Sequence, residues 1–218
     1  MYAEPEAARP LQVAPSTLHY WLEGGERRGK QYLPVIRAET TSAKTVTWGE
    51  FVEAALLRQY RRAHFVPMVE LRAAIEILHH DLGVPYPLAH SRPFVGAGRK
   101  LLLKAQTEAE VPGEYCLVAV AGGQQTLTPA SEAFYDRVDW EGDLASGWRP
   151  AEDSKSPVRI RPDQRFGLPA IGGIKTETVW EHLEAGEDPR DVATELDLTV
   201  EEVRWALAYE TSARARAS

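Results

Sequence analysis

The chain has 218 residues, of which 44% are hydrophobic and 26% are charged; these values are ordinary for a globular protein of one or two domains. It contains no run of about 18 apolar residues, which a membrane-spanning helix needs, and its acidic N-terminal stretch MYAEPEAARP is unlike a signal peptide. The single cysteine, Cys116, excludes an intramolecular disulfide and favours a cytoplasmic location.

Charge is distributed unevenly along the chain. Residues 1–105 contain 14 Lys and Arg against 10 Asp and Glu, whereas residues 106–218 contain 11 against 22. The first part therefore carries +4 and the second −11, within a formal net charge of −7. Nucleic acid would favour the first part and be repelled by the second. The pattern indicates two partners of different charge, although an acidic surface also serves simply to keep a protein in solution.

Residues 2–25 are predicted to form a small helix-turn-helix. A short first helix ends at Pro10, and Pro15 begins a second helix, where its missing N–H costs nothing. The second helix turns an apolar face inward and ends at a pair of glycines. Residues 26–36 follow as a β-hairpin, or wing, with Gly29 at its tip. The inward-facing residues of the second helix are Leu18, Trp21 and Leu22.

The other side of this second helix is a candidate DNA-binding surface. It carries short or planar polar groups near a helix N-terminus, the arrangement in which a recognition helix meets base edges and phosphates. The hairpin adds cations that pair with phosphate, and because one small helix reads only a few base pairs, we expect a homodimer. The alternative is a structural helical hairpin without a DNA-binding role. The predicted DNA-binding residues are Ser16, Thr17, His19, Tyr20, Arg27, Arg28 and Lys30.

The middle of the chain is predicted to contain two helices and then short strands. A capping-box pattern, Thr47-Trp48-Gly49-Glu50, begins one helix, and Pro67 begins the next. The Pro- and Gly-rich residues 84–113 predict turns around a short strand pair, and the β-like runs within residues 114–168 predict a small connector.

Residues 165–210 are predicted to form three helices with marked boundaries. Thr176 caps the first helix, and Asp188-Pro189 begins the second. Thr199 begins the third as a capping box, with Glu202 three residues later. Because so short a unit has no room for a pocket of its own, we expect it to bind a partner.

The fold class predicted from these elements is mainly α with a small β-containing middle segment, an N-terminal helix-turn-helix and a C-terminal three-helix unit. Residues 1–105 form a DNA-binding region with its following helices, and residues 106–164 form the connector. Residues 165–210 form the three-helix unit, and residues 211–218 form a loose tail.

The sequence lacks the common signatures of an enzyme. There is no G-x-S-x-G elbow, no Walker loop and no G-x-G-x-x-G after a strand. Adjacent His79 and His80 diverge by about 100° on a helix and do not share a metal ion. Cys116 lies in an apolar run that is typical of an inert core thiol. We therefore expect no catalytic residues, no bound metal and no cofactor.

Both ends of the chain resemble known families. EAARPLQVAPSTLHYWLEGG resembles the MerR-type helix-turn-helix, in which E-A-A-x-x-L-x-V, a turn and S-T-L-x-x-W mark the two helices. FGLPAIGGIKTETVWEHLEAGEDPRDVATELDLTVEEVRWALAYE resembles a small antitoxin domain with F-G-x-P-x-I, V-W-E-x-L-E-A-G-E and V-x-x-A-L-A-Y-E motifs. Together with VPYPLAHSRPF, the chain resembles a VapB-type antitoxin with a MerR-like N-terminus.

The resemblance implies a function without catalysis. The protein would bind and neutralise a PIN-domain ribonuclease toxin and repress its own operon by binding operator DNA. Because such a ribonuclease holds its metal ions on carboxylates, an arginine of the antitoxin tail would compete with the metal for them. Apolar helix faces around two tryptophans would supply the docking area, although these tryptophans also suit a core. The predicted partner-binding residues are Trp180, Trp205, Arg214 and Arg216.

Two departures from the family patterns limit what is carried over. The usual G-T-R-I-P turn is shortened to Gly173-Ile174-Lys175-Thr176, so a contact made by its arginine is not transferred. Pro10 replaces a residue that is usually apolar. The alternative function is a stand-alone helix-turn-helix regulator without a toxin partner.

Overall fold

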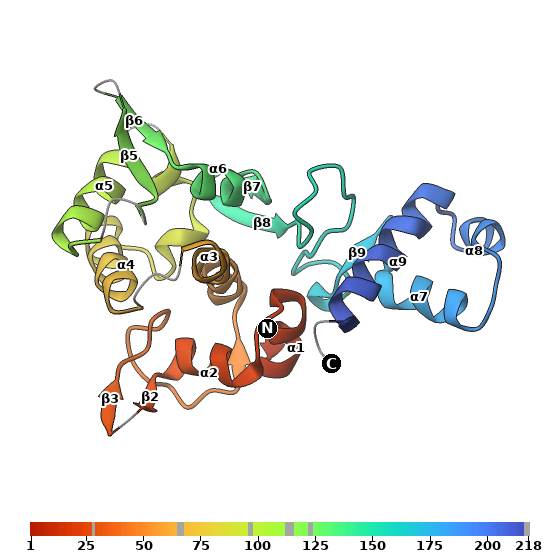
Figure 1. Cartoon of the computed structure of the whole chain (residues 1–218), viewed down its shortest axis with the longest axis horizontal. Helices are drawn as coiled ribbons and strands as arrows, with labels where there is room; N and C mark the ends of the chain where they lie inside the picture. Colours follow the sequence, from red (N-terminus) through yellow and green to blue (C-terminus); the bar gives the residue numbers. More distant parts are fainter. Residues whose placement is uncertain (28, 65–67, 96–97, 112–115, 122–123, 216–218) are drawn as a thin grey trace. The chain divides into compact units, whose positions relative to one another are not determined.

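The computed structural model describes residues 1–27, 29–64, 68–95, 98–111, 116–121 and 124–215. About half of the chain is helical, and its short strands form two-stranded sheets (Figure 1). At this level the predicted fold class, mainly α with small β elements, is confirmed. Among the described residues, no helix is long and apolar enough to cross a membrane.

The chain divides into two compact units. The first contains Met1–Asp136 and Trp140–Ala145, and the second contains Arg137–Asp139 and Ser146–Ser218. The boundary passes through a hairpin, in which β7 (Val138–Glu141) pairs with β8 (Leu144–Trp148).

The first unit begins with two short helices and a hairpin. The first helix does not end at Pro10 as predicted: Pro10 lies in its last turn, and the left-handed Gln12 (φ 52°) ends it. The second helix begins at Pro15, and left-handed Gly24 (φ 72°) follows it. The elements are β1 (Tyr2–Ala3), α1 (Glu4–Leu11), α2 (Pro15–Glu23), β2 (Gly25–Arg27), β3 (Lys30–Tyr32) and β4 (Thr45–Val46); β1 pairs with β4, and β2 with β3, both antiparallel.

Helices dominate the rest of the first unit. The strand pair predicted within residues 84–113 is wrong: α5 occupies Gly98–Glu108 and buries Leu102 and Ala105, so the apolar spacing after Gly98 outweighs the glycine-rich punctuation before it. The elements are α3 (Trp48–His64), α4 (Met68–Leu82), the 3₁₀ turns η1 (Pro87–Ala89) and η2 (Arg92–Phe94), α5, β5 (Val118–Ala121), β6 (Gln124–Leu127) and α6 (Pro129–Tyr135).

A buried ion cluster holds the segment after the hairpin against α2 and α3. The Arg37 guanidinium donates to the Glu23 carboxylate, and its Nε donates to Glu50 Oε1 at 2.7 Å. All three side chains are at most 7% exposed. Glu50 also accepts from the backbone N–H of Thr47 at 2.7 Å, which confirms the predicted capping box. One guanidinium thus neutralises two carboxylates that would otherwise be costly to bury.

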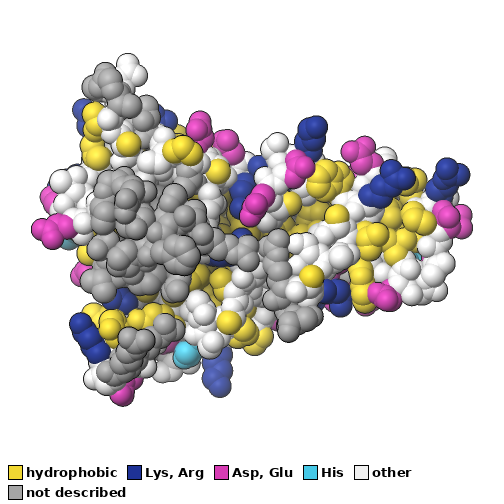
Figure 2. Space-filling model, in the orientation of Figure 1, with side chains coloured by type: hydrophobic (Ala, Val, Ile, Leu, Met, Phe, Trp, Pro, Cys, Tyr) yellow, Lys and Arg dark blue, Asp and Glu magenta, His cyan; other side chains and the backbone are white. Residues whose placement is uncertain are grey.

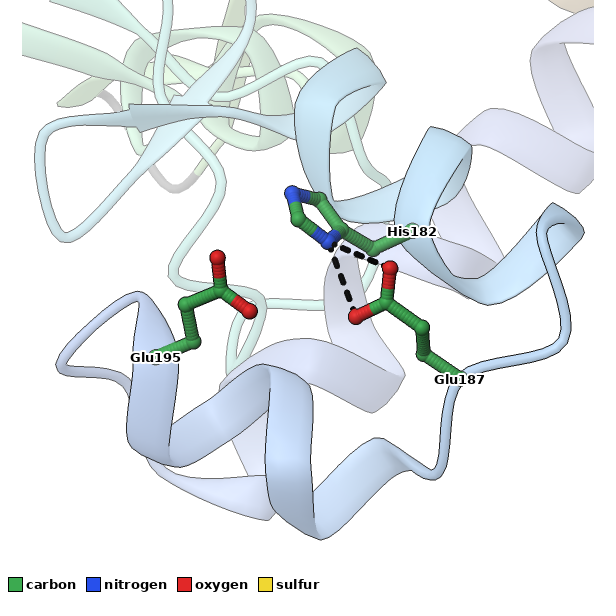
Figure 3. A group of neighbouring side chains, drawn as sticks. All are labelled: His182, Glu187 and Glu195. Carbon is green, nitrogen blue, oxygen red and sulfur yellow. Dashed lines mark hydrogen bonds and ion pairs between the residues drawn. The ribbon is translucent and has the colours of Figure 1, made fainter.

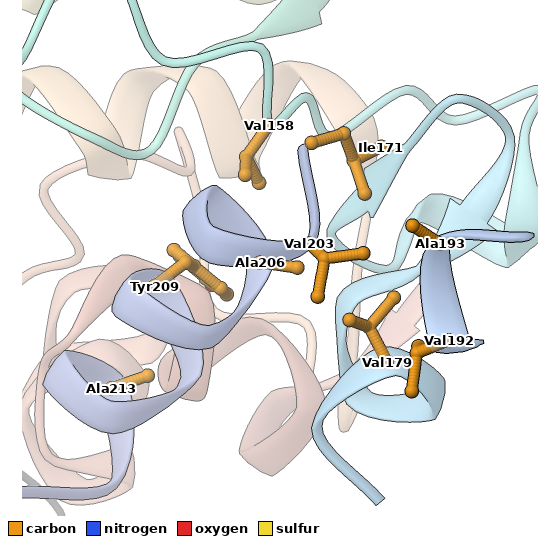
Figure 4. Close-up of a cluster of buried hydrophobic side chains, with 9 residues drawn as sticks. All are labelled: Val158, Ile171, Val179, Val192, Ala193, Val203, Ala206, Tyr209 and Ala213. Carbon is orange, nitrogen blue, oxygen red and sulfur yellow. The ribbon is translucent and has the colours of Figure 1, made fainter. Parts of the chain in front are cut away.

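The second unit is built around three helices that share one apolar cluster. Val179, Val203 and Ala206 are at most 1% exposed and meet at its centre (Figure 4). The elements after β8 are the 3₁₀ turn η4 (Arg165–Gly167), β9 (Ala170–Ile171), β10 (Ile174–Lys175), α7 (Thr176–Glu184), α8 (Pro189–Glu195) and α9 (Val200–Ala215). The remaining members of the cluster are Val158, Ile171, Val192, Ala193, Tyr209 and Ala213.

Two local predictions in the second unit are corrected. Thr176 does not cap α7 with its side chain; it is the first helical residue, and its buried hydroxyl donates to Glu210 Oε1 at 2.7 Å. Residues 211–215 are not a loose tail, because α9 continues through Ala215 and buries Ala213. The predicted caps at Asp188 and Thr199 are confirmed, since Asp188 accepts from the N–H of Arg190 and Thr199 exchanges hydrogen bonds with Glu202.

Candidate functional site

Helix α2 presents the predicted base-reading residues on the side opposite its buried face. Ser16 and His19 are exposed, and Thr17 and Tyr20 are half-buried, whereas Leu18 is buried. This alternation follows from the helical period, which places residues three and four apart on one face. The first turn of α2 therefore offers small hydroxyl groups next to an imidazole.

A buried carboxylate on α1 orients His19. The Nδ1 atom of His19 lies 3.0 and 3.2 Å from the two carboxylate oxygens of Glu4. The Glu4 side chain is 11% exposed and the His19 side chain 53% exposed. The carboxylate is therefore largely shielded from solvent, while the imidazole remains accessible. A histidine held at Nδ1 keeps Nε2 for a ligand.

The hairpin that follows α2 carries part of the predicted basic set. Arg27 pairs in register with Lys30 across the turn at Gly29, whose φ of 72° suits glycine. Lys30 Nζ lies 5.5 Å from the centroid of the Tyr32 ring. The prediction for Arg28 falls outside the described residues.

The second unit places two of the four predicted partner-binding residues together. The Arg214 guanidinium lies over the Trp180 ring, 3.6 Å from its centroid. It also lies 3.4 Å from Glu177 Oε1 and 3.5 Å from Glu210 Oε2. Arg214 is thus held on α7 rather than carried on a free arm.

Trp205 is the third predicted partner-binding residue that the structure describes. It is half-buried and packs against the apolar cluster of the second unit. Between charged groups, apolar side chains show on the surface over the end of the molecule that carries α7–α9 (Figure 2). The prediction for Arg216 falls outside the described residues.

A second group of polar side chains gathers where α7 turns into α8. The Nδ1 atom of His182 lies 3.0 Å from both carboxylate oxygens of Glu187, and the Glu195 carboxylate faces the same space (Figure 3). The bond to Glu187 raises the pKa of His182 above its ordinary value. Both glutamates are exposed, and a hydrogen-bonded imidazolium accounts for the arrangement, so we assign no metal to it.

Sequence reasoning missed the buried ionisable groups of the first unit. Glu53 lies completely buried on α3, and burial raises its pKa to about 8, although its Oε1 accepts from the Leu88 N–H at 3.0 Å. Residues 51–57 are otherwise apolar, as in an ordinary buried helix face. The only signal in the sequence for a buried carboxylate is Glu53 itself within this run. Cys116 is half-buried, and burial raises the pKa of its thiol, as expected for an unreactive thiol.

Comparison with known proteins gives matches over both parts of the chain. Residues 158–209 match a family described as a protein of unknown function (DUF433). Two proteins of Mycobacterium tuberculosis are each 29% identical to the chain. "Uncharacterized protein Rv2308" aligns over 96% of this chain and 89% of its own length, and "Putative antitoxin VapB45" over 95% and 92%.

A solved structure has a similar fold over nearly the whole chain. The X-ray crystal structure of Rv2018 from Mycobacterium tuberculosis superposes with a TM-score of 0.76 at 25% identity. The match covers 94% of this chain and 96% of that one. The similarity therefore extends well beyond the segment matched by the family of unknown function.

Proposed function

We propose that this protein is an antitoxin that neutralises a PIN-domain ribonuclease and represses its own operon. The observation that carries the proposal is the similarity, over 95% of the chain, to the protein named "Putative antitoxin VapB45". The PIN-domain partner comes from the resemblance of residues 165–210 to an antitoxin domain. We further propose that the protein acts without catalysis, as a cytoplasmic homodimer.

In this proposal the second unit binds the toxin. Residues 165–210 contain 11 Asp and Glu against 4 Lys and Arg, which suits the basic RNA-binding surface of a ribonuclease and disfavours nucleic acid. Partly exposed Trp205 and exposed Leu207 on α9 supply apolar contact area between the charges. Arg214 contacts Trp180 at the end of α9, and we propose that Arg216 competes for the metal-binding carboxylates of the toxin.

The first unit binds operator DNA in the same proposal. α1 and α2 act as a MerR-like helix-turn-helix, with α2 as the recognition helix and the β2–β3 hairpin as a wing. Ser16, Thr17 and His19 reach base edges or phosphates, and Lys30 reaches phosphate. The exposed surface of α2 and the orientation of His19 by Glu4 support this assignment.

Inhibition of a ribonuclease tests the antitoxin proposal. The full chain is co-expressed with the product of the neighbouring gene, and cleavage of a labelled RNA is followed as the full chain is added. We expect a stable complex and cleavage that falls to background near equimolar ratio. Absence of a complex together with undiminished cleavage would contradict the proposal.

The second candidate function is a stand-alone transcriptional regulator. The observation that favours it is the exposed α2 face followed directly by a hairpin, which needs no toxin to bind DNA. Binding to DNA upstream of its own gene, with equal affinity in the presence and absence of the neighbouring gene product, would favour the regulator over the antitoxin.

A further inference from the structure

The pair formed by Glu4 and His19 determines which nitrogen of the histidine ring carries the proton. Helices α1 and α2 pack against each other and bring the carboxylate of Glu4, the first residue of α1, to the Nδ1 atom of His19 (Figure 1). A carboxylate accepts hydrogen bonds and donates none, so the proton of this bond belongs to Nδ1. In the neutral ring the other nitrogen, Nε2, is therefore an acceptor.

The Nε2 atom is the end of the ring that a ligand can use. The imidazole is more than half exposed, and its hydrogen bonds within the described part of the chain are those of Nδ1 with Glu4. The partner of the ring is held in place, because the backbone N–H of Glu4 donates to the carbonyl oxygen of Lys44 at 3.1 Å. His19 thus presents an accessible acceptor on an oriented ring.

The other polar groups on this face of α2 have no such fixed preference. Ser16, which lies three residues before His19, and Thr17 carry hydroxyl groups that rotate and either donate or accept. Such groups suit several bases and discriminate little between them. Tyr20 is half-buried, and its ring lies edge-on to that of Tyr32 in the hairpin, 6.3 Å between centroids. His19 is therefore the residue of this set with a defined acceptor.

An acceptor on α2 has few partners on duplex DNA. Phosphate oxygens are acceptors themselves, as are N7 and O6 of guanine and O4 of thymine, so none of these groups bonds to an unprotonated Nε2. The donors in the major groove are the amino groups of adenine, at N6, and of cytosine, at N4. A histidine in this tautomer therefore selects a base that carries an amino group.

We propose that His19 recognises a base amino group, adenine N6 or cytosine N4, in the major groove of operator DNA. Glu4 is the positioning residue that sets this preference. The inference rests on the proposed binding of DNA by α2. Nε2 accepts one hydrogen bond from the amino group, while Nδ1 keeps its bond to the Glu4 carboxylate. Ser16 and Thr17 add contacts without selecting the base.

The tautomer is tested first, on the full chain without DNA. Nitrogen chemical shifts of isotope-labelled histidine distinguish a protonated ring nitrogen from an unprotonated one, and His19→Phe identifies the signals of His19. At about pH 8, where an ordinary histidine is neutral, we expect a protonated Nδ1 and an unprotonated Nε2. Glu4→Gln should populate both tautomers, because an amide both donates and accepts. A ring protonated mainly at Nε2 in the unaltered chain would overturn the inference.

The base preference is tested by binding to DNA from upstream of the gene, also at about pH 8. Each adenine of the protected region is replaced in turn by purine, which lacks the N6 amino group. Each cytosine is replaced by pyrimidin-2-one, which lacks the N4 amino group, so the two arms distinguish the bases. We expect one position in each half-site at which the replacement weakens binding about threefold to tenfold, and His19→Phe should bind the two DNAs alike there. The same losses in His19→Phe at every position would overturn the role of His19.

The role of Glu4 in this preference is tested with a matched pair of variants of α1. Glu4→Gln should reduce the discrimination at the sensitive position. Glu6→Gln, at an exposed site two residues later, keeps an acceptor for the Ala3 N–H and should discriminate as the unaltered chain does. Equal discrimination by the two variants would overturn the role of Glu4.

The outcomes separate this inference from the proposed function. If the chain binds upstream DNA but no position depends on His19, the inference fails and the repressor function stands. If the chain binds no DNA, the repressor function fails and the inference fails with it.

Discussion

The two units of the molecule are stabilised in different ways. The first unit contains a buried charge cluster in which Arg37 bridges Glu23 and Glu50. The second unit depends on an apolar cluster beneath three helices, two of which, α8 and α9, begin at local side-chain caps. A capping residue can be recognised from the sequence, whereas the partners of a buried charge cannot, so the helix starts of the second unit are easier to predict than the charge cluster of the first.

The largest expected effect is the loss of the cation from the buried cluster. Arg37→Met leaves two carboxylates buried without a counter-charge, which costs about 3–5 kcal/mol of unfolding free energy. Arg190→Met, at an exposed site on α8, is the control and should change stability by less than about 0.5 kcal/mol. Urea unfolding measures both, and similar values for the two variants would show that the cluster does not hold the first unit.

A smaller effect is expected from the buried hydroxyl of the second unit. Thr176→Val removes the donor to Glu210, which is 2% exposed, and should cost about 1–3 kcal/mol. Thr194→Val removes the same kind of group from an exposed site on α8 and should cost far less. Thermal unfolding of the two variants decides the matter, and equal losses would contradict a structural role for the Thr176 bond.

The capping boxes allow the same substitution to be compared in both units. Thr47→Ala and Thr199→Ala each remove an acceptor for a helix N–H and should each cost about 1 kcal/mol. Thr211→Ala, at an exposed position of α9, provides the reference. Chemical denaturation measures the loss of unfolding free energy in each variant. A loss for Thr47→Ala several times that for Thr199→Ala would show that removing the cap also weakens the bond between Glu50 and Arg37.

The smallest effect concerns pH in the second unit. Because Glu187 raises the pKa of His182, their bond stabilises the folded state below the ordinary histidine pKa of about 6.5. That stabilisation is lost as pH rises through the raised pKa of the folded state. Glu187→Gln should lower the pKa of His182 in an NMR titration, whereas Glu184→Gln, outside the hydrogen bond, should lower it less. Equal pKa values in the two variants would exclude the Glu187 bond as the cause.

Prediction from the sequence succeeded where the determinants are adjacent in the chain. Pro15 is the first residue of α2 as predicted, because its fixed φ and missing N–H suit that position. Asp188 and Thr199 cap the next helices as predicted, and each bonds to a residue two or three positions later. It failed at α5, where the nearby glycines suggested turns but the apolar residues after Gly98 form a buried helix face. It also failed at residues 211–215, which continue α9 and place Arg214 against Trp180.

The candidate sites divide in the same way. The exposed face of α2 follows from helical spacing and was predicted, but the Glu4 carboxylate that orients His19 lies 15 residues away. In the sequence His79 is simply one of two adjacent histidines on a predicted helix, and only the packing of residues 33–38 against α4 reveals its buried Nε2 atom. Groups brought together by tertiary packing leave no spacing pattern in the sequence.

The central claim, that the first unit binds DNA and the second binds the toxin, is tested by two full-length variants measured in both assays. Lys30→Ala removes a hairpin cation, and Leu207→Glu adds a charge to an apolar position of α9 that is 36% exposed. We expect Lys30→Ala to weaken binding to upstream DNA and flatten its salt dependence while toxin inhibition stays intact. Leu207→Glu should weaken inhibition of the ribonuclease and leave DNA affinity unchanged. Loss of both activities in either well-folded variant, or of neither in both, would contradict the division.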